Sequence, residues 1–230
     1  MDIVYPFRHD PQIGNLTLKY SIRSVRKHFT DIGNIYVIGA DPQMPGIIHI
    51  PTKDDSGYAR NIFNKMLQIA NTKEVSEDLM MIMDDHFMLK SGPVDLYPLY
   101  ANNTLQQLAP TQGNVYKLII QNTIRLLKEK DKSTRNYNIH CPAIFNKAKL
   151  RELAEAYPLL ESNMGFILKS LYFNHFDIPA QFEIADCKIK RDWQHLQIES
   201  KIAGRDCFST GKEKECPNIL SFLEKLYPET

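Results

Sequence analysis

The sequence lacks the short motifs that identify several large classes of protein. It has no apolar run that approaches the roughly 20 residues of a membrane-spanning helix. It also has no CxxC pair, no zinc-type spacing of cysteine and histidine, no G-x-G-x-x-G and no G-x-S-x-G. Gly211-Lys212 has neither the upstream glycine nor the following serine or threonine of a P-loop. The function therefore has to be inferred from combinations of residues.

The chain also carries little net charge and few cysteines. A formal charge of +1 on 230 residues gives no overall attraction to nucleic acid or membranes. The four cysteines form no recognisable disulfide framework, and the first residues enter a strand directly, without a basic and apolar signal segment. We therefore expect reduced thiols and a cytoplasmic location. The length of 230 residues allows a substantial core, in one large domain or in one domain with a small appendage, and the hydrophobic content of 43% is ordinary for a globular protein.

One apolar stretch runs directly into charged residues. Residues 79–83 read Leu-Met-Met-Ile-Met, which predicts a buried strand of a parallel sheet. Asp84, Asp85 and His86 follow at once. Adjacent carboxylates repel each other and lose hydration near a core, so this position favours a cation or a polar ligand. Since ligands of open α/β sheets bind at the carboxyl ends of the strands, we expect the functional site here.

Strand and helix patterns alternate along most of the chain. This order predicts an α/β fold with a mostly parallel central sheet flanked by helices and a less regular C-terminal part, including a polar loop over 207–212. The expected strands cover residues 2–7, 34–39, 47–50, 79–83, 94–100, 137–146 and 182–190, and the expected helices cover residues 18–29, 59–70, 114–128, 147–156, 165–174 and 218–226.

Three other residues are candidates for the site. His140 lies in an expected strand, where it is either a hydrogen-bonded core histidine or a neutral imidazole that completes a carboxylate site. Arg60 and Lys65 lie near the start of the helix over 59–70, where the helix dipole favours an anion, although ordinary solvated charges would look the same. Two carboxylates and a distant histidine suit Mn²⁺ or Mg²⁺ bridging the phosphates of a nucleotide.

Four short segments, taken together and in this order, carry a resemblance. They are Tyr5-Pro6-Phe7-Arg8-His9, Met83-Asp84-Asp85-His86-Phe87, Ile139-His140-Cys141-Pro142 and Phe208-Ser209-Thr210. The combination resembles small GT-A type glycosyltransferases, of the kind found in bacteriophages and in bacterial capsule or surface polysaccharide gene sets. The resemblance implies a Rossmann-like fold that binds a nucleotide-diphospho-sugar, most simply a UDP-sugar.

The resemblance also implies roles for individual residues. Asp84 and Asp85 take the part of the DxD motif, which binds Mn²⁺ or Mg²⁺ and the donor. Because the motif reads Asp-Asp-His, it does not fix which of the two carboxylates contacts the metal, and we favour Asp85. The remaining implied roles are these: Tyr5, Pro6, Phe7, Arg8 and His9 hold the nucleobase and ribose, His140 completes the metal shell, Arg60 or Lys65 approaches the phosphates, and Ser209, Thr210 and Lys212 cover the pyrophosphate. Glu161 is a catalytic base chosen on position alone. Apart from the resemblance, His86 is expected to contact substrate, because a strand end exposes consecutive residues to opposite sides.

The sequence thus predicts a metal-dependent hexosyl- or pentosyltransferase that moves a sugar from a nucleotide-diphosphate sugar to a hydroxyl acceptor. Residues 1–100 are expected to bind the nucleotide-sugar, and residues 101–230 to form the acceptor side. The acceptor is a glycan or a hydroxymethylated base in phage DNA. Two alternatives stay open, namely a nucleotidyltransferase or sugar-phosphate transferase on a similar fold, and a non-catalytic module that binds a cation or a nucleotide.

Overall fold

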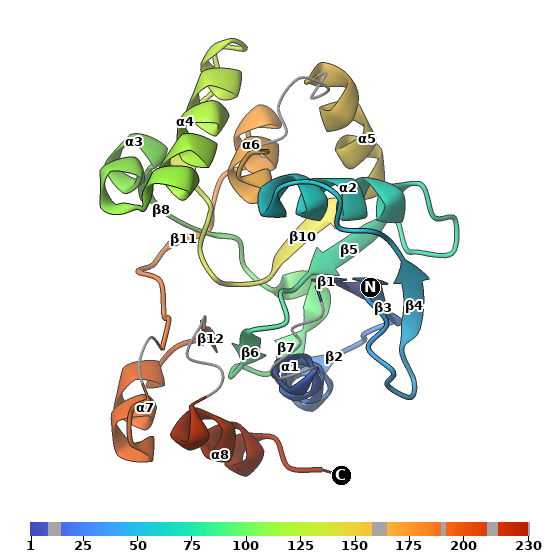
Figure 1. Ribbon diagram of the computed structural model, residues 1–230, viewed down its shortest axis with the longest axis vertical. Helices are drawn as coiled ribbons and strands as arrows, with labels where there is room; N and C mark the ends of the chain where they lie inside the picture. Colours follow the sequence, from blue (N-terminus) through green and yellow to red (C-terminus); the bar gives the residue numbers. More distant parts are fainter. Residues whose placement is uncertain (9–14, 158–164, 190–191, 211–215, 230) are drawn as a thin grey trace.

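A five-stranded sheet forms the centre of the molecule (Figure 1). The computed structural model describes residues 1–8, 15–157, 165–189, 192–210 and 216–229. The strand order is β10-β5-β1-β3-β4, in which β10 is antiparallel to β5 and the other pairs are parallel. The strands are β1 (Asp2–Phe7), β3 (Ile35–Gly39), β4 (Ile48–Pro51), β5 (Asp78–Met81) and β10 (Ala143–Asn146).

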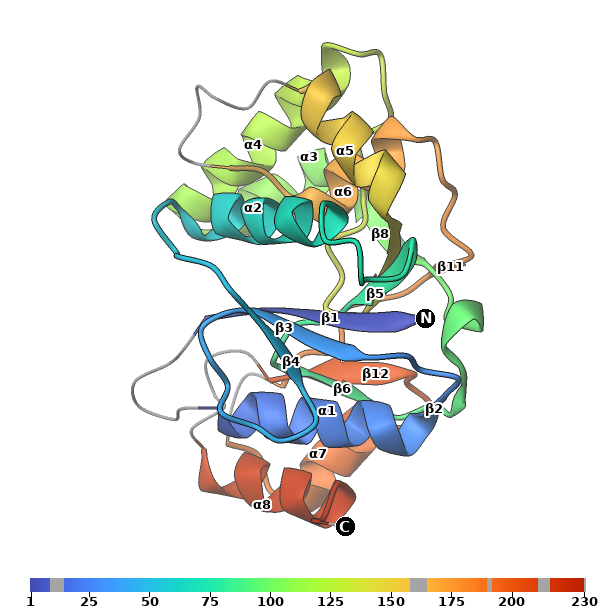
Figure 2. The ribbon, with the colours of Figure 1, turned by 90° about the vertical axis from the view of Figure 1, so that its right-hand side faces the viewer.

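Helices cover both faces of this sheet (Figure 2). Every residue of β1 is buried, and alternate side chains face opposite layers: Ile3, Tyr5 and Phe7 pack with α1, whereas Val4 packs with α2. This two-sided burial explains why the strand is apolar throughout. One face carries α1 (Leu16–His28), and the other carries α2 (Tyr58–Ala70), α3 (Leu105–Leu108), α4 (Asn114–Lys128), α5 (Lys147–Ala156) and α6 (Leu168–His175).

A second, smaller layer closes the molecule below the sheet. Strands β6 (His86–Met88) and β12 (Cys207–Ser209) pair antiparallel, and helices α7 (His195–Ile202) and α8 (Pro217–Leu226) cover them. Phe87 and Phe208 of this ribbon pack in one cluster with Phe222 of α8. The remaining elements are short: β2 (Phe29–Thr30), β7 (Gly92–Pro93), η1 (Val94–Leu96), β8 (Tyr100–Thr104), η2 (Ala109–Thr111), β9 (Arg135–Asn136) and β11 (Phe182–Glu183).

No helix in the described part of the chain has both the length and the apolar character needed to cross a bilayer.

The expected strands over 2–7, 34–39 and 47–50 match β1, β3 and β4 closely, and the mostly parallel sheet flanked by helices is confirmed.

The expected strand over 94–100 is wrong. Residues Val94–Leu96 form a 3₁₀ turn, in which the Tyr97 N–H donates to the Val94 carbonyl at 3.3 Å, and β8 starts only at Tyr100. Proline at positions 93 and 98 removes two backbone donors, so the segment between them has little capacity to pair as a strand.

The expected strand over 137–146 is correct only in its last four residues. Before them, the Cys141 N–H donates to the Ile139 carbonyl at 2.7 Å, and Pro142 has no N–H. The backbone therefore turns at His140 instead of pairing, which places this histidine in the loop that leads into β10.

Three further boundaries differ in the second half of the chain. Within the described residues 182–189 of the strand expected over 182–190, only β11 pairs in a sheet, and Lys188 forms an isolated bridge to Ser209. The expected polar loop over 207–212 begins instead as strand β12, because Cys207 and Phe208 are apolar enough to be buried, Cys207 in one cluster with Met88 of β6 and Phe208 in one cluster with Phe222 of α8. The helix expected over 165–174 is α6, which begins three residues later, at Leu168.

Candidate active site

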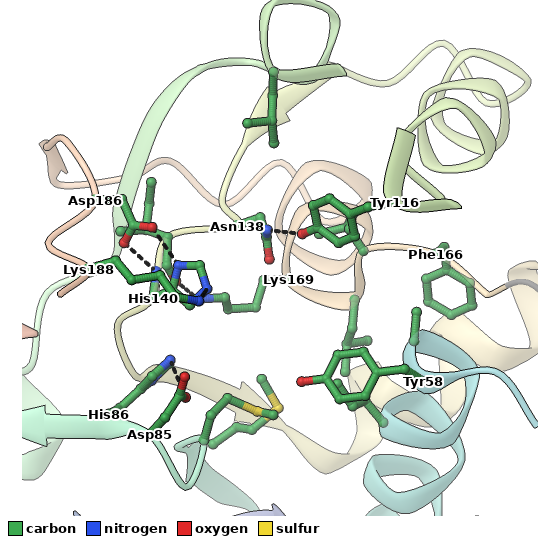
Figure 3. Close-up of a pocket in the computed structure, with 18 of the residues that line it drawn as sticks. Tyr58, Asp85, His86, Tyr116, Asn138, His140, Phe166, Lys169, Asp186 and Lys188 are labelled. Carbon is green, nitrogen blue, oxygen red and sulfur yellow. Dashed lines mark hydrogen bonds and ion pairs between the residues drawn. The ribbon is translucent and has the colours of Figure 1, made fainter. Parts of the chain in front are cut away.

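A cavity of about 830 Å³ opens at the carboxyl end of the parallel strand β5 (Figure 3). Its walls come from the turn after β5, the start of α2, the segment before β10, the start of α6 and the segment from Asp186 to Lys188. Because β10 is antiparallel to β5, with Ala143 opposite Met81, the residues just before β10 reach the same edge as the residues just after β5. The cavity is therefore built where the sequence predicts a ligand site.

The acidic pair occupies the turn between β5 and β6. Asp85 lines the cavity, and its backbone carbonyl accepts a hydrogen bond from the Thr210 N–H at 3.3 Å. Asp84 accepts a hydrogen bond from the Thr17 hydroxyl of α1, with 3.3 Å between the oxygens. The two carboxylates thus have different neighbours, and Asp85 is the one that faces the cavity.

His86 is a buried histidine with no hydrogen-bond partner among the described residues at either ring nitrogen. Its Nε2 lies 3.8 Å from an oxygen of Asp85. Burial, together with the nearby positive charges of Lys169 and Lys188, lowers its pKa well below the usual value. The ring is therefore neutral near pH 7. An unpaired buried imidazole is costly, which indicates that a ligand completes this environment.

Directly opposite His86 in the β6–β12 ribbon lies Ser209, and Thr210 follows it. Both residues are fully buried, and neither hydroxyl has a hydrogen-bond partner in the described structure. Residues that face each other across an antiparallel pair project from the same side of the ribbon. His86 and Ser209 therefore present unpaired polar groups on the same face, beside Asp85.

His140 forms a second polar cluster on the facing wall (Figure 3). Its Nδ1 lies 2.5 Å from Asp186 Oδ2, and its backbone N–H donates to Asp186 Oδ1 at 3.1 Å. Its Nε2 lies 3.1 Å from the Lys188 ammonium. Since a lysine ammonium can only donate, Nε2 is the acceptor and Nδ1 carries the proton. Asp186 thus fixes the neutral tautomer whose lone pair is directed at Lys188.

Burial alone would raise the pKa of Asp186, but the hydrogen bonds from His140 lower it to about 2. Asp186 is therefore ionised at neutral pH. The rings of His140 and His86 lie edge to face, with centroids 5.9 Å apart, so the two clusters meet across the cavity.

Lys169 holds the turn that carries His140. Its buried ammonium donates to the carbonyl of Ile139 and, at 3.0 Å, to the carbonyl of Cys141. Burial lowers its pKa. A buried lysine bonded to the carbonyls on both sides of His140 restricts the backbone there, and its charge adds to the positive potential of the cavity.

Three further polar side chains line the opening. The Asn138 amide donates to the Tyr116 hydroxyl, and the Tyr58 side chain reaches toward Asp85 (Figure 3). Although Tyr58 is 58% exposed, partial desolvation of its hydroxyl and the nearby carboxylates of Asp85 and Asp84 raise its pKa. These side chains can both donate and accept hydrogen bonds.

Sequence reasoning did not find Asp186, Lys188, Lys169 or the tyrosines. Asp186 and Lys188 are two residues apart, and Lys169 interrupts the apolar start of α6. These local patterns are weak signals, because they also occur on solvated surfaces.

The first predicted segment lies mainly in the core. Tyr5, Pro6 and Phe7 are buried in β1, and Arg8 is exposed. The Tyr5 hydroxyl and the Ser21 hydroxyl lie 3.1 Å apart, and Ser21 donates to the His86 carbonyl at 2.5 Å. Tyr5 therefore supports the position of His86 through the core and does not itself line the cavity among the described residues.

The two predicted cations of α2 have protein partners. Lys65 is buried, lies 2.7 Å from Asp54 Oδ1 and donates to the Phe7 carbonyl at 2.8 Å. The Arg60 guanidinium lies 6.0 Å from the Phe63 ring centroid. Neither side chain is among the described residues that line the cavity. His9, Glu161 and Lys212 lie outside the residues that the structure describes.

A divalent cation would find only part of a coordination shell here. The Asp85 carboxylate and the unpaired His86 nitrogens are suitable ligands. His140, in contrast, has its ring nitrogens on Asp186 and Lys188. Within residues 1–8, 15–157, 165–189, 192–210 and 216–229, no group of three His, Cys, Asp or Glu side chains has metal-binding geometry. Asp85 and His86 are therefore the residues that would hold a cation.

The architecture is that of the GT-A glycosyltransferases. The galactosyltransferase LgtC, in a crystal structure in complex with donor and acceptor sugar analogs, matches the chain with a TM-score of 0.55 and 11% sequence identity. The match covers 100% of this chain and 97% of LgtC. An active-site mutant of LgtC matches with a TM-score of 0.54 and the same identity and coverage. At this identity the likeness establishes the fold, and it confirms the Rossmann-like GT-A architecture. No protein-family model and no curated protein sequence matches the chain.

Proposed function

We propose that this protein is a glycosyltransferase that moves a sugar from a nucleotide-diphosphate sugar to a hydroxyl acceptor. The observation that supports this most strongly is the convergence of Asp85, the unpaired His86 and the His140–Asp186 pair in one cavity of a GT-A fold. In open α/β sheets, the carboxyl edge that carries this cavity is where ligands bind. UDP-sugars are the donors to test first, with hexoses and pentoses both included.

The donor diphosphate would lie against Asp85, His86 and Lys188, whereas Ser209, opposite His86 in β12, is fully buried and is not among the described residues that line the cavity. A buried imidazole without a hydrogen-bond partner is suited to bond a phosphate oxygen, and the Lys188 ammonium offsets the negative charge of the phosphates. A Mn²⁺ or Mg²⁺ ion held by Asp85 and His86 would stabilise the negative charge of the leaving nucleotide diphosphate. Metal dependence is thus part of the proposal.

His140 is the group best placed to take a proton from the acceptor hydroxyl. Asp186 keeps the proton on Nδ1, so Nε2 has a lone pair and is directed at the cavity. A hydroxyl that replaces Lys188 at Nε2 would donate its hydrogen bond there, and Asp186 would stabilise the imidazolium formed when the proton moves. Glu161 stays a prediction from the sequence for the same role.

Residues 1–100, together with Lys188 from the second half of the chain, would then bind the donor, and other residues of 101–230 would form the acceptor side. Residues 1–100 provide Asp85 and His86, and residues 101–230 provide Phe166, Asn138 and Tyr116 on the facing side. An aromatic surface next to hydrogen-bonding groups is suited to the face and hydroxyls of a sugar ring. An acceptor with a sugar hydroxyl is therefore favoured over the hydroxymethylated DNA base, which stays an alternative.

The His140–Asp186 pair also favours a second candidate, a sugar-phosphate transferase. An imidazole with one nitrogen held by a carboxylate, and with a lone pair on the other that could leave the Lys188 ammonium, is a suitable acceptor for a phosphoryl group. The two candidates release different products, because sugar transfer yields a nucleoside diphosphate and sugar-phosphate transfer yields a nucleoside monophosphate.

Product analysis tests the proposal directly. The protein is incubated with UDP-, GDP-, ADP- and TDP-sugars, with Mn²⁺ or with EDTA, and the released nucleotides are separated by ion-exchange chromatography. We expect a nucleoside diphosphate that appears only with metal, is lost in Asp85→Asn and is retained in the surface control Asp95→Asn. A nucleoside monophosphate would favour the second candidate. Absence of any nucleotide release or metal-dependent nucleotide binding would indicate a non-catalytic module.

A further inference from the structure

Two buried cysteines meet directly behind the cavity. The Sγ atoms of Cys141 and Cys207 lie 2.8 Å apart, and the residues are 5% and 3% exposed. Both are free thiols. Cys141 directly follows His140, and Cys207 is the first residue of β12, which pairs with the strand that begins at His86. The contact therefore joins the two segments that hold the two histidines of the cavity.

We propose that Cys141 and Cys207 are a dithiol site that a small two-electron oxidant such as hydrogen peroxide converts to an intramolecular disulfide. In this reaction two S–H bonds and the O–O bond break, and one S–S bond forms. The two sulfur atoms lose two electrons, which pass with the two thiol hydrogens to the peroxide and give two molecules of water. This site requires no particular transfer reaction, so it stands independently of the proposed function.

The surroundings favour this pair over other combinations of cysteines. Cys187 has its sulfur 3.6 Å from the Lys201 carbonyl, which it faces instead of another thiol. Cys216 is the N-cap of α8 and is half-buried. A disulfide needs sulfur atoms that already approach each other, and the Sγ atoms of Cys141 and Cys207 do so.

The bond would have a structural consequence in the site. Lys169 already fixes the backbone around Cys141 through two carbonyls, and β12 is fixed by its pairing with β6. A covalent link between these two anchored segments would restrict movement of His140 relative to His86. The dithiol is thus placed to make the cavity more rigid on oxidation.

Peptide mapping tests the proposal, because trypsin separates all four cysteines onto different peptides. The folded protein is treated with hydrogen peroxide, alkylated in denaturant, digested without reductant and analysed by mass spectrometry. We expect one cross-linked species, in which residues 136–147 are joined to residues 206–212, and we expect a reductant to separate it. The peptides over 170–188 and 215–225 should be found alkylated and unlinked.

Two serine variants provide the matched comparison. Cys141→Ser should abolish the cross-link, whereas Cys187→Ser should leave its yield unchanged. In case Cys141→Ser does not fold, phenylarsine oxide, which bridges paired thiols, should protect Cys141 and Cys207 of the unaltered protein from later alkylation. The proposal is overturned if the linked peptides appear only after unfolding, if the two thiols oxidise separately to sulfinic acids, or if phenylarsine oxide protects neither.

Discussion

Replacement of Asp186 with asparagine tests the arrangement that fixes His140. The carboxylate accepts hydrogen bonds from the ring and from the backbone of His140, and against the effect of burial these bonds lower its pKa from 3.8 to about 2. A shift of this size corresponds to about 2 kcal/mol. Because the side chain is 34% exposed, solvent screening reduces the expected contribution to about 1 kcal/mol.

The sign of the pH dependence follows from the direction of the shift. A carboxyl group whose pKa is lower in the folded state stabilises the fold fully above its unfolded value, here about pH 4, and loses this effect as the pH falls toward about 2. We therefore expect Asp186→Asn to lower the free energy of unfolding by about 1 kcal/mol at pH 7. The difference from the natural protein should shrink below pH 4.

Urea unfolding followed by circular dichroism at several pH values provides the measurement. Asp95→Asn, which removes an exposed carboxylate outside the cavity, is the control and should leave the free energy of unfolding nearly unchanged at pH 7. The reasoning is refuted if Asp186→Asn is as stable as the natural protein at pH 7, or if the difference between them stays constant down to pH 2.

Two further predictions concern the core and the ligand. Phe145→Ala should lower the free energy of unfolding by about 3–5 kcal/mol in urea titrations, because it removes a fully buried ring whose centroid lies 4.7 Å from that of Tyr172. Phe145→Leu should lower the free energy of unfolding clearly less. Equal losses in the two variants would contradict the close packing of the Phe145 ring. UDP with Mn²⁺, at a hundredfold excess over its dissociation constant, should add about 2.7 kcal/mol of stability in thermal denaturation. His86→Ala should remove this effect and Asp95→Asn should retain it, while an equal effect of UDP in EDTA would show that no metal is needed.

The sequence was sufficient for the parts of the fold that depend on local pattern. The apolar runs of β1, β3 and β5 each indicate a buried strand. The single apolar stripe of α2 indicates a helix with one buried face. The position of Asp84 and Asp85 followed from the same argument, since residues after a buried parallel strand emerge at its carboxyl end. Helix α4 was also found with its observed bounds, Asn114–Lys128.

Long-range contacts decided the rest. Asp186 bonds to His140 across 46 residues, and Lys169 reaches the carbonyl of Ile139 across 30. The periodic pattern of one helix or strand carries no information about contacts this far apart in the sequence. Lys169 in an apolar helix and Asp186 in an irregular segment therefore looked ordinary. The turn at His140 depends on Pro142 and on Asp186 together, and for this reason the strand over 137–146 was predicted too long.

The reversed direction of β10 has a consequence for how this protein can change. The cavity, at one edge of the sheet, takes residues both from the segment that follows β5 and from the segment that precedes β10. The distance between these two segments therefore depends on the lengths of both strands, which must stay matched. The other edge, where Asp78 lies opposite Asn146, carries none of the described cavity residues. Insertions, tags or new domains should therefore be accommodated at that distal edge without altering the geometry of the site.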